Sequence, residues 1–140
     1  MNELLLQSEY AEIIIQLLKP PYSINSIIKL VFLSFCVRNE KRKSYSNRKT
    51  DFVNILLDNM IIKLISHSDE FIYIFDTINK LKECGWIKTY NGRITVLKEL
   101  NCFECEHAFL NGYKDKKNNP IFEANKLDDK AFIEEVLRHV

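Results

Sequence analysis

The apolar residues of segment 3–18 recur at three- and four-residue intervals, the pattern of an amphipathic helix; they are Leu6, Tyr10, Ile13, Ile14, Leu17 and Leu18. Pro20–Pro21 ends this helix, since proline cannot continue one. A second helix is predicted from a cap at Ser23 or Asn25 to about Arg38. Apolar residues cover most of its circumference, so we expect it to be central and buried.

Two further helices are predicted beyond a polar stretch. Thr50 caps a helix over 51–66, whose inward residues are expected to be Phe52, Ile55, Leu56, Met60, Leu64 and Ile65. Ser68 caps a helix over 69–84, and its inner stripe is expected to be Ile72, Phe75, Ile78 and Leu81. Gly85 follows the last turn and ends that helix in the left-handed conformation.

The segment after Gly85 predicts a β-hairpin. Residues 86–90 and 93–97 are rich in β-formers, and Asn91–Gly92 between them is the preferred two-residue hairpin turn. Helices that lead into a tight hairpin describe a winged helix. We therefore expect a mainly α fold with a small β-hairpin, in which a winged-helix-like core over about 23–97 lies within one domain, 1–140.

A C-terminal helical extension is expected over 98–140. Residues 98–111 are predicted to be helical and 111–120 to form a loop. Asp128 then caps a terminal helix, which carries on one face Phe132, Ile133, Val136 and Leu137. The helices at both ends of the chain are amphipathic, so either could dock on a partner.

Composition and charge narrow the class of protein. The 140 residues are 46% hydrophobic, enough for one buried core. The net charge of +1 gives no overall attraction to nucleic acid. Glu3 precedes the first apolar residues, where a signal peptide carries basic ones, and no apolar run reaches the roughly 18 residues of a spanning helix. With four cysteines and no export signal, a cytoplasmic protein without a membrane partner is expected.

Positive charge is concentrated in segment 38–49. Six cations stand there against Glu40 alone, a local excess of +5; they are Arg38, Lys41, Arg42, Lys43, Arg48 and Lys49. Such a segment can contact nucleic-acid phosphates without sequence preference, and Tyr45 could stack on a base. The alternative is a solvated loop. Lys88 and Arg93 of the hairpin could also touch a nucleic-acid backbone, or could simply face solvent.

The helix before the predicted wing argues against a sequence-specific repressor. In a DNA-reading winged helix this element enters the major groove. Here residues 69–84 sum to −2, and Asp69 and Glu70 lead the helix, where phosphates would be repelled. Tyrosines often anchor protein interfaces, so Tyr73 and Tyr90 are candidate partner contacts. Phe132 and Leu137 of the amphipathic terminal helix are the other candidates.

Cys102, Cys105 and His107 form the one motif with metal-binding spacing, and Cys84 lies upstream. Four such ligands would suffice for structural zinc. The pair has no turn glycine and no second close pair, however, so a helical core position is the preferred interpretation. We expect no metal, no cofactor and no small-molecule substrate. No phosphate-binding loop or catalytic motif is recognised, so a non-enzyme is expected, although a zinc or redox protein stays an alternative.

The order of elements resembles that of the small middle components of three-component ABC-ATPase systems, the accessory subunits of Lamassu-type bacterial anti-phage defence. The resemblance covers about residues 1–97. It rests on the apolar run Ile28–Phe35, the basic segment Arg38–Lys49, and the closing turn Leu81–Ile87 (Leu-Lys-Glu-Cys-Gly-Trp-Ile). The high charge of the basic segment and the Cys102/Cys105 pair depart from that group.

This resemblance implies a non-catalytic accessory subunit that bridges an SMC/Rad50-like ABC ATPase and an effector nuclease and assists DNA engagement. It implies no catalytic residues for this subunit. The alternative function is a winged-helix transcriptional regulator, supported by Lys88 and Arg93 of the hairpin.

Overall fold

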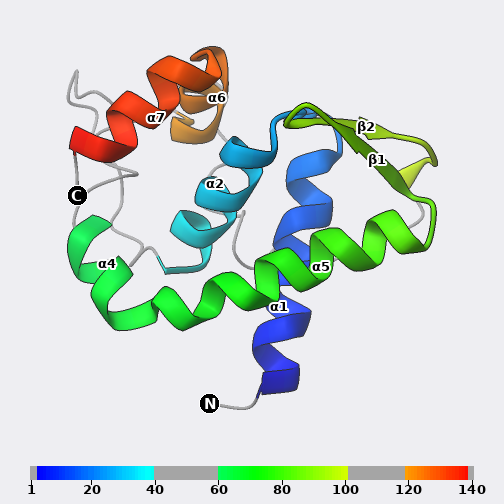
Figure 1. The fold of residues 1–140 in the computed structure, drawn as a ribbon, viewed down its shortest axis with the longest axis horizontal. Coiled ribbons are helices and arrows are strands. Elements are labelled where there is room, and N and C mark those ends of the chain that lie inside the picture. Colours follow the sequence, from blue (N-terminus) through cyan, green and yellow to red (C-terminus); the bar gives the residue numbers. More distant parts are fainter. Residues whose placement is uncertain (1–2, 40–59, 101–118, 139–140) are drawn as a thin grey trace.

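The structure, a computed structural model, describes residues 3–39, 60–100 and 119–138. These residues form helices and one two-stranded antiparallel sheet, in the arrangement that Figure 1 shows. A mainly α fold with a small β-hairpin is therefore confirmed. The predictions for the helix start at 51–59, the loop at 111–118 and most of the helix at 98–111 lie outside the described residues.

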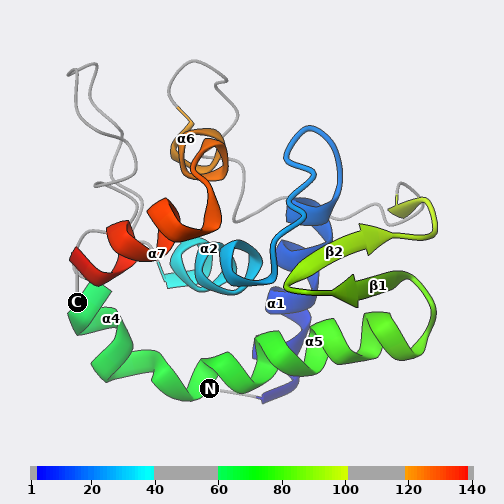
Figure 2. The ribbon, with the colours of Figure 1, turned by 45° about the horizontal axis from the view of Figure 1, so that its top comes forward.

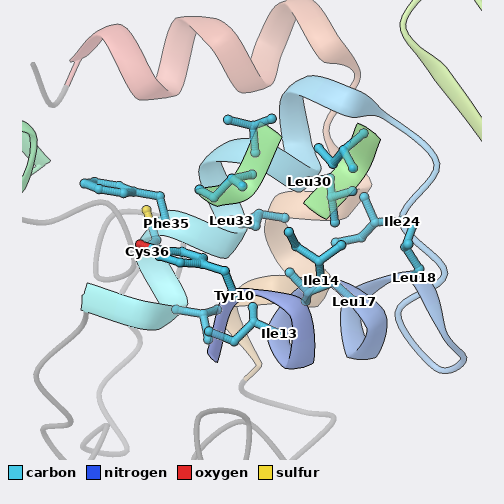
Figure 3. Packing of buried hydrophobic residues seen from close by; sticks show 14 of the residues in the cluster. Tyr10, Ile13, Ile14, Leu17, Leu18, Ile24, Leu30, Leu33, Phe35 and Cys36 are labelled. Atoms are coloured by element: carbon cyan, nitrogen blue, oxygen red, sulfur yellow. The ribbon is translucent and has the colours of Figure 1, made fainter. Parts of the chain in front are cut away.

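The core is centred on helices α1 (Glu3–Leu18) and α2 (Ile27–Asn39). The first of these has the predicted bounds. Figure 3 shows their facing side chains packed together, with Tyr10, Ile13, Ile14 and Leu17 against Leu30, Leu33 and Phe35. Helix α2 is buried around most of its surface and packs on α1, α5 and α7, as its apolar circumference predicts.

The entry to α2 differs from the prediction, because this stretch pairs with the hairpin. Ser26, rather than Ser23 or Asn25, accepts a hydrogen bond from the Lys29 backbone N–H at 3.4 Å. The Asn25 carbonyl instead accepts from Ile94 N–H, and Ser26 forms a bridge with Arg93. The cap therefore lies one residue after Asn25, at a residue that also makes an isolated β-bridge with the hairpin.

Helix α4 (Met60–His67), the 3-10 turn η1 (Ser68–Glu70) and α5 (Phe71–Glu83) follow one another as a curved rod along one side of the molecule (Figure 1). Ser68 lies inside the 3-10 turn, and no side-chain cap bond is made at either helix start, so the predicted Ser68 cap is wrong. Glu70 is buried instead of facing solvent.

The inner stripe of this rod is also rotated from the prediction. On α5 the buried residues are Ile74, Thr77, Ile78 and Leu81. Ile72 and Phe75, which were expected inside, are exposed, as is Ile65 of α4. The segment has more apolar residues than one helix face can bury, and the packing on α1 selects the face around Ile74.

The end of α5 and the hairpin agree with the prediction. Gly85 has φ 76°, and the N–H groups of Gly85 and Trp86 donate to the carbonyls of Lys82 and Leu81, a Schellman stop. Strand β1 (Ile87–Tyr90) pairs with β2 (Arg93–Val96). Asn91 and Gly92 turn between them with φ of 49° and 76°.

Helix α6 (Pro120–Lys126) was not predicted. The Asn119 side chain caps it by accepting from Ile121 N–H at 3.0 Å, with Pro120 at the first helical position. The Tyr22 hydroxyl accepts from Asn119 Nδ2 at 2.9 Å, and the rings of Tyr22 and Phe122 lie 4.9 Å apart. These contacts fix α6 on the loop between α1 and α2.

Helix α7 (Asp129–Arg138) begins at the predicted cap, where the Asp128 carboxylate accepts from Ala131 N–H at 2.7 Å. Phe132 and Val136 are buried, whereas Ile133 and Leu137 are exposed, so only half of its predicted apolar face enters the core. In Figures 1 and 2, α2 lies between α7 and α5.

Among the helices of the described residues, none combines the length and the apolar character needed to cross a membrane.

Candidate partner-binding surface

Several large apolar side chains of α4 and α5 are exposed. On α5, Ile72 is 60% exposed and Phe75 is 49% exposed. On α4, the exposed apolar residues are Ile61, Ile62 and Ile65. A lone exposed apolar residue is ordinary, but several on two successive helices are a candidate for a surface that binds another molecule.

The start of α5 is held on α2 by aromatic contacts. The ring of Phe71 stacks on Phe35 with centroids 4.5 Å apart, and meets Phe32 edge-on at 5.9 Å. Phe35 is fully buried, whereas Phe32 and Phe71 are partly exposed. This ring cluster therefore extends from the core to the surface beside Phe75.

An apolar groove continues from that cluster between three helices. We name it the α2–α5–α7 groove, and its lining is Ile27, Ile28, Val31, Phe32, Phe71, Phe75, Gly92, Asp129 and Ile133. Most of the lining residues come from α2, α5 and α7. Figure 2 shows that α2 lies between the other two helices. Among the described residues that line the groove, Asp129 alone has an ionisable side chain.

Charged groups meet at the hairpin end of this groove. Arg93 Nη1 lies 3.8 Å from Asp129 Oδ1, an ion pair that connects β2 to α7. Lys29 is buried, and its Nζ donates to the Asn125 carbonyl at 3.0 Å. Burial lowers the pKa of Lys29, and the negative charge of Asp129 opposes that shift. Within the described part of the chain, Asp129 Oδ1 is buried and accepts no hydrogen bond.

A buried polar cluster positions the start of α5 from the other side. The Tyr10 hydroxyl donates to Glu70 Oε1 at 2.5 Å, and Asn39 Nδ2 donates to both groups. His67 Nδ1 lies 3.0 Å from Glu70 Oε2. Burial, followed by the hydrogen bond and charge of Glu70, raises the pKa of Tyr10 well above its ordinary value. The cluster joins α1, α2 and the α4–α5 junction.

The residues predicted to contact nucleic acid are not brought together by the described part of the structure. Arg38 is mostly buried and forms an ion pair with Glu9 of α1. Arg93 is paired with Asp129, and Lys88 is exposed on β1. Five candidates lie outside the described residues: Lys41, Arg42, Lys43, Arg48 and Lys49. Since its charge is already paired within the fold, Arg38 is better understood as a structural residue.

The four predicted interface residues have different environments. Tyr90, at the hairpin end, is 74% exposed, and Leu137 on α7 is 64% exposed. Tyr73 is half-buried, and its carbonyl accepts from the Thr77 hydroxyl at 2.8 Å. Phe132 is fully buried, so its prediction as a partner contact is corrected: it packs in the core beneath α7.

Cys102, Cys105 and His107 lie outside the described residues, so the zinc alternative stays open. Cys84 is exposed at the end of α5. In segments 3–39, 60–100 and 119–138, no three His, Cys, Asp or Glu side chains are grouped so that they could hold a metal ion.

Sequence reasoning missed the residues that make the groove. Phe75 was assigned to the core, and the sequence did not place α7 beside α2. One signal was present: segment 71–78 reads Phe-Ile-Tyr-Ile-Phe-Asp-Thr-Ile, with apolar residues on more than one helix face. A helix with two apolar faces can bury one face in the core and leave the other exposed for a partner.

Comparison with protein-family models, with curated proteins and with solved structures finds no match for this chain.

Proposed function

We propose that the protein is a non-catalytic subunit that binds protein partners, built on a winged-helix core. The topology supports this core. Helix α1, helices α2 and α5, and the β1–β2 hairpin follow in winged-helix order, and Ser26 before α2 makes a single β-bridge with Arg93 of β2, at the place of the first strand of such a fold. In this assignment, the chain between α2 and α5, which includes α4, is an insertion into the winged-helix order. Helix α1 belongs to the core because it packs on both α2 and α5.

The observation that carries the function is the outer face of α5. In a DNA-reading winged helix this face enters the major groove and meets phosphates. Here its first half presents Ile72 and Phe75 with the carboxylates of Asp69 and Asp76, and no cation stands between residues 69 and 76. An apolar and acidic surface is repelled by DNA but suits a protein partner.

The resemblance to the middle components of three-component ABC-ATPase systems supplies the partners of the proposal. They are an SMC/Rad50-like ATPase and an effector nuclease of a cytoplasmic anti-phage defence complex. The subunit would bridge the two proteins, and Lys88 with the basic segment 41–49 would add non-specific contact to DNA.

Co-purification tests the proposal. The tagged protein is co-expressed with the products of its neighbouring genes and purified at about 0.3 M salt, where exposed electrostatic contacts are well screened. We expect a coiled-coil ATPase to be recovered in stoichiometric amount. Recovery of the protein alone, or as a homodimer, contradicts the proposal.

A transcriptional regulator is the second candidate, favoured by the exposed Lys88 on the hairpin. Its test is fluorescence anisotropy with a fragment of the protein's own promoter at about 0.15 M salt, against a scrambled fragment of equal length. Specific binding that Lys88→Ala weakens would favour the regulator. Equal affinity for both fragments would argue against it.

A further inference from the structure

The α2–α5–α7 groove is built from rows of side chains one helical turn apart. Helix α2 contributes Ile28 and Phe32, at positions i and i+4. The other two helices contribute Phe71 and Phe75 of α5, and Asp129 and Ile133 of α7, with the same spacing. Side chains four residues apart form ridges along a helix, and the furrow between such ridges accepts the ridge of another helix.

The backbone of the groove restricts what can occupy it. The lining is helical except for Gly92 of the hairpin, and beyond the first turn of each helix the N–H groups are already bonded within that helix. An extended peptide laid here would find almost no partners for its own backbone groups, and leaving these unpaired on burial is costly. An α-helix satisfies its backbone internally, so a helix is the secondary structure that suits this groove.

The charged groups at the groove indicate which residues should flank the apolar stripe of that helix. Asp129 lines the groove with a side chain that is 34% exposed, and its Oδ1 atom is buried and accepts no hydrogen bond within the described residues. Its ion-pair partner Arg93 stands 3.8 Å away, beyond hydrogen-bond distance. On the α5 side, the exposed Asp76 lies next to Phe75. A lysine or arginine on the incoming helix could meet either carboxylate.

The same charges disfavour a second copy of this chain as occupant. Two copies that met through this face would bring Asp76 and Glu134, both exposed beside apolar groove residues, against the like charges of the other copy. Like charges placed together at an interface cost free energy and select against the pairing. A partner of opposite charge is therefore favoured.

We propose that the α2–α5–α7 groove binds an amphipathic α-helix of a protein partner, and that basic residues flank the apolar stripe of that helix. The apolar stripe packs between Phe75 and Ile133, and the basic residues meet Asp129 and Asp76. This inference rests on the proposed function and names the surface and the kind of segment through which the subunit holds a partner.

Matched variants of the full-length protein test the apolar contact in the co-purified complex. Phe75→Lys places a charge in the groove, and Leu5→Lys makes the same change at an α1 residue of equal exposure, 50% against 49%. Both side chains are half-exposed, so both variants should fold, which circular dichroism checks. We expect Phe75→Lys to weaken partner binding at least about tenfold, as at an interface hot spot, and Leu5→Lys to leave it within about twofold.

A second pair of variants tests the charge of the partner helix. Asp76→Lys reverses a charge beside the groove, and Glu83→Lys reverses one at the far end of the same helix. We expect Asp76→Lys to lower the affinity more than Glu83→Lys, with a difference that shrinks as salt is raised. Equal effects, or tighter binding to Asp76→Lys, would overturn the basic character of the partner.

Photo-crosslinking identifies the occupant. A benzoylphenylalanine at position 75 is expected to crosslink to a basic amphipathic helix of the partner, and one at Ser8, beside a second groove between α1 and α5, is not. If a partner co-purifies but Phe75→Lys binds it as well as Leu5→Lys does, the groove proposal is wrong and the proposed function stands. If no partner co-purifies, the proposed function itself is wrong. Crosslinks between two copies of this chain would show that the groove mediates self-association, and would overturn the proposal of a partner helix.

Discussion

The hydroxyl of Tyr10 donates a hydrogen bond to the buried carboxylate of Glu70 at 2.5 Å, across 60 residues of sequence. Tyr10 belongs to α1, and Glu70 immediately precedes α5. Asn39, the last residue of α2, donates to both groups. This polar cluster, together with the rings of Phe35 and Phe71, therefore holds the start of α5 on the core and with it one side of the groove.

Removing the Tyr10 hydroxyl should destabilise the fold. Tyr10→Phe keeps the ring in the core but takes one donor from the buried Glu70, which should cost about 1–3 kcal/mol in the free energy of unfolding. Tyr90→Phe is the control, because Tyr90 is exposed and the same change there should be nearly neutral. Urea denaturation of both variants measures the difference. Equal stabilities would show that the Tyr10–Glu70 bond contributes nothing.

The same tyrosine predicts a loss of stability in alkali. The raised pKa of Tyr10 means that the folded state keeps its proton at a pH where the unfolded state, with a pKa of about 10, releases it. The stability due to Tyr10 is thus fully present below pH ~10 and falls as pH rises further, by up to about 1.4 kcal/mol per pH unit. The stability difference between the natural protein and Tyr10→Phe should shrink between pH ~9 and pH ~11. A constant difference would contradict the raised pKa.

The buried Lys29 predicts that stability changes with pH in the opposite direction. Its pKa is lowered by burial, so below the ordinary value of 10.5 the unfolded state binds the proton more tightly than the folded state does. The contribution of Lys29 should therefore become more favourable as pH rises toward 10.5. Lys29→Met keeps the packed stem and removes this dependence, whereas Lys80→Met, at an exposed position of α5, should not alter it. Chemical denaturation at several pH values between neutral and 10.5 checks the sign.

Two neighbours on α7 should respond differently to truncation. Phe132 is fully buried, so Phe132→Ala leaves a cavity and should cost about 3–5 kcal/mol. Leu137 is 64% exposed, and Leu137→Ala should stay within about 0.5 kcal/mol. Thermal unfolding separates the two. A small effect at Phe132 would mean that α7 does not pack on the core in solution.

The glycine that ends α5 should tolerate asparagine better than alanine. Gly85 has φ 76°, and a Cβ added there meets nothing within 4 Å, so the cost of substitution is conformational rather than steric. Gly85→Ala should cost about 1–2 kcal/mol, because L-residues with a Cβ disfavour the left-handed region. Gly85→Asn should cost less, since asparagine visits that region more readily. If both variants were equally stable, backbone strain would not be the cause.

Local patterns sufficed where neighbouring residues decide the structure. The three- and four-residue spacing from Leu6 to Leu18 predicted α1, and the Asp128 carboxylate fixed the start of α7. Gly85 and Asn91–Gly92 predicted the stop of α5 and the hairpin turn, because few residues other than glycine and asparagine adopt positive φ readily. Helix α6 was missed although the Asn119–Pro120 start signal was present. The helix is short, and it depends on contacts with residues far away in the sequence. Tyr22 bonds to Asn119, 97 residues away, and Lys29 bonds to Asn125, 96 residues away.

By itself the sequence determined the hairpin and, apart from α6, which segments of the described chain are helical, since these depend on backbone conformation and on contacts within a few residues. Only the tertiary structure decided which face each helix buries. Ile72 and Ile74 are equally apolar, yet the packing of α5 on α1 and α2 buries Ile74 and leaves Ile72 in solvent. The position of α7 beside α2 then joins Phe75 and Ile133 in one groove. Burial depends on how all the helices pack together. When a helix has two apolar faces, the spacing of its residues alone does not decide which face is buried.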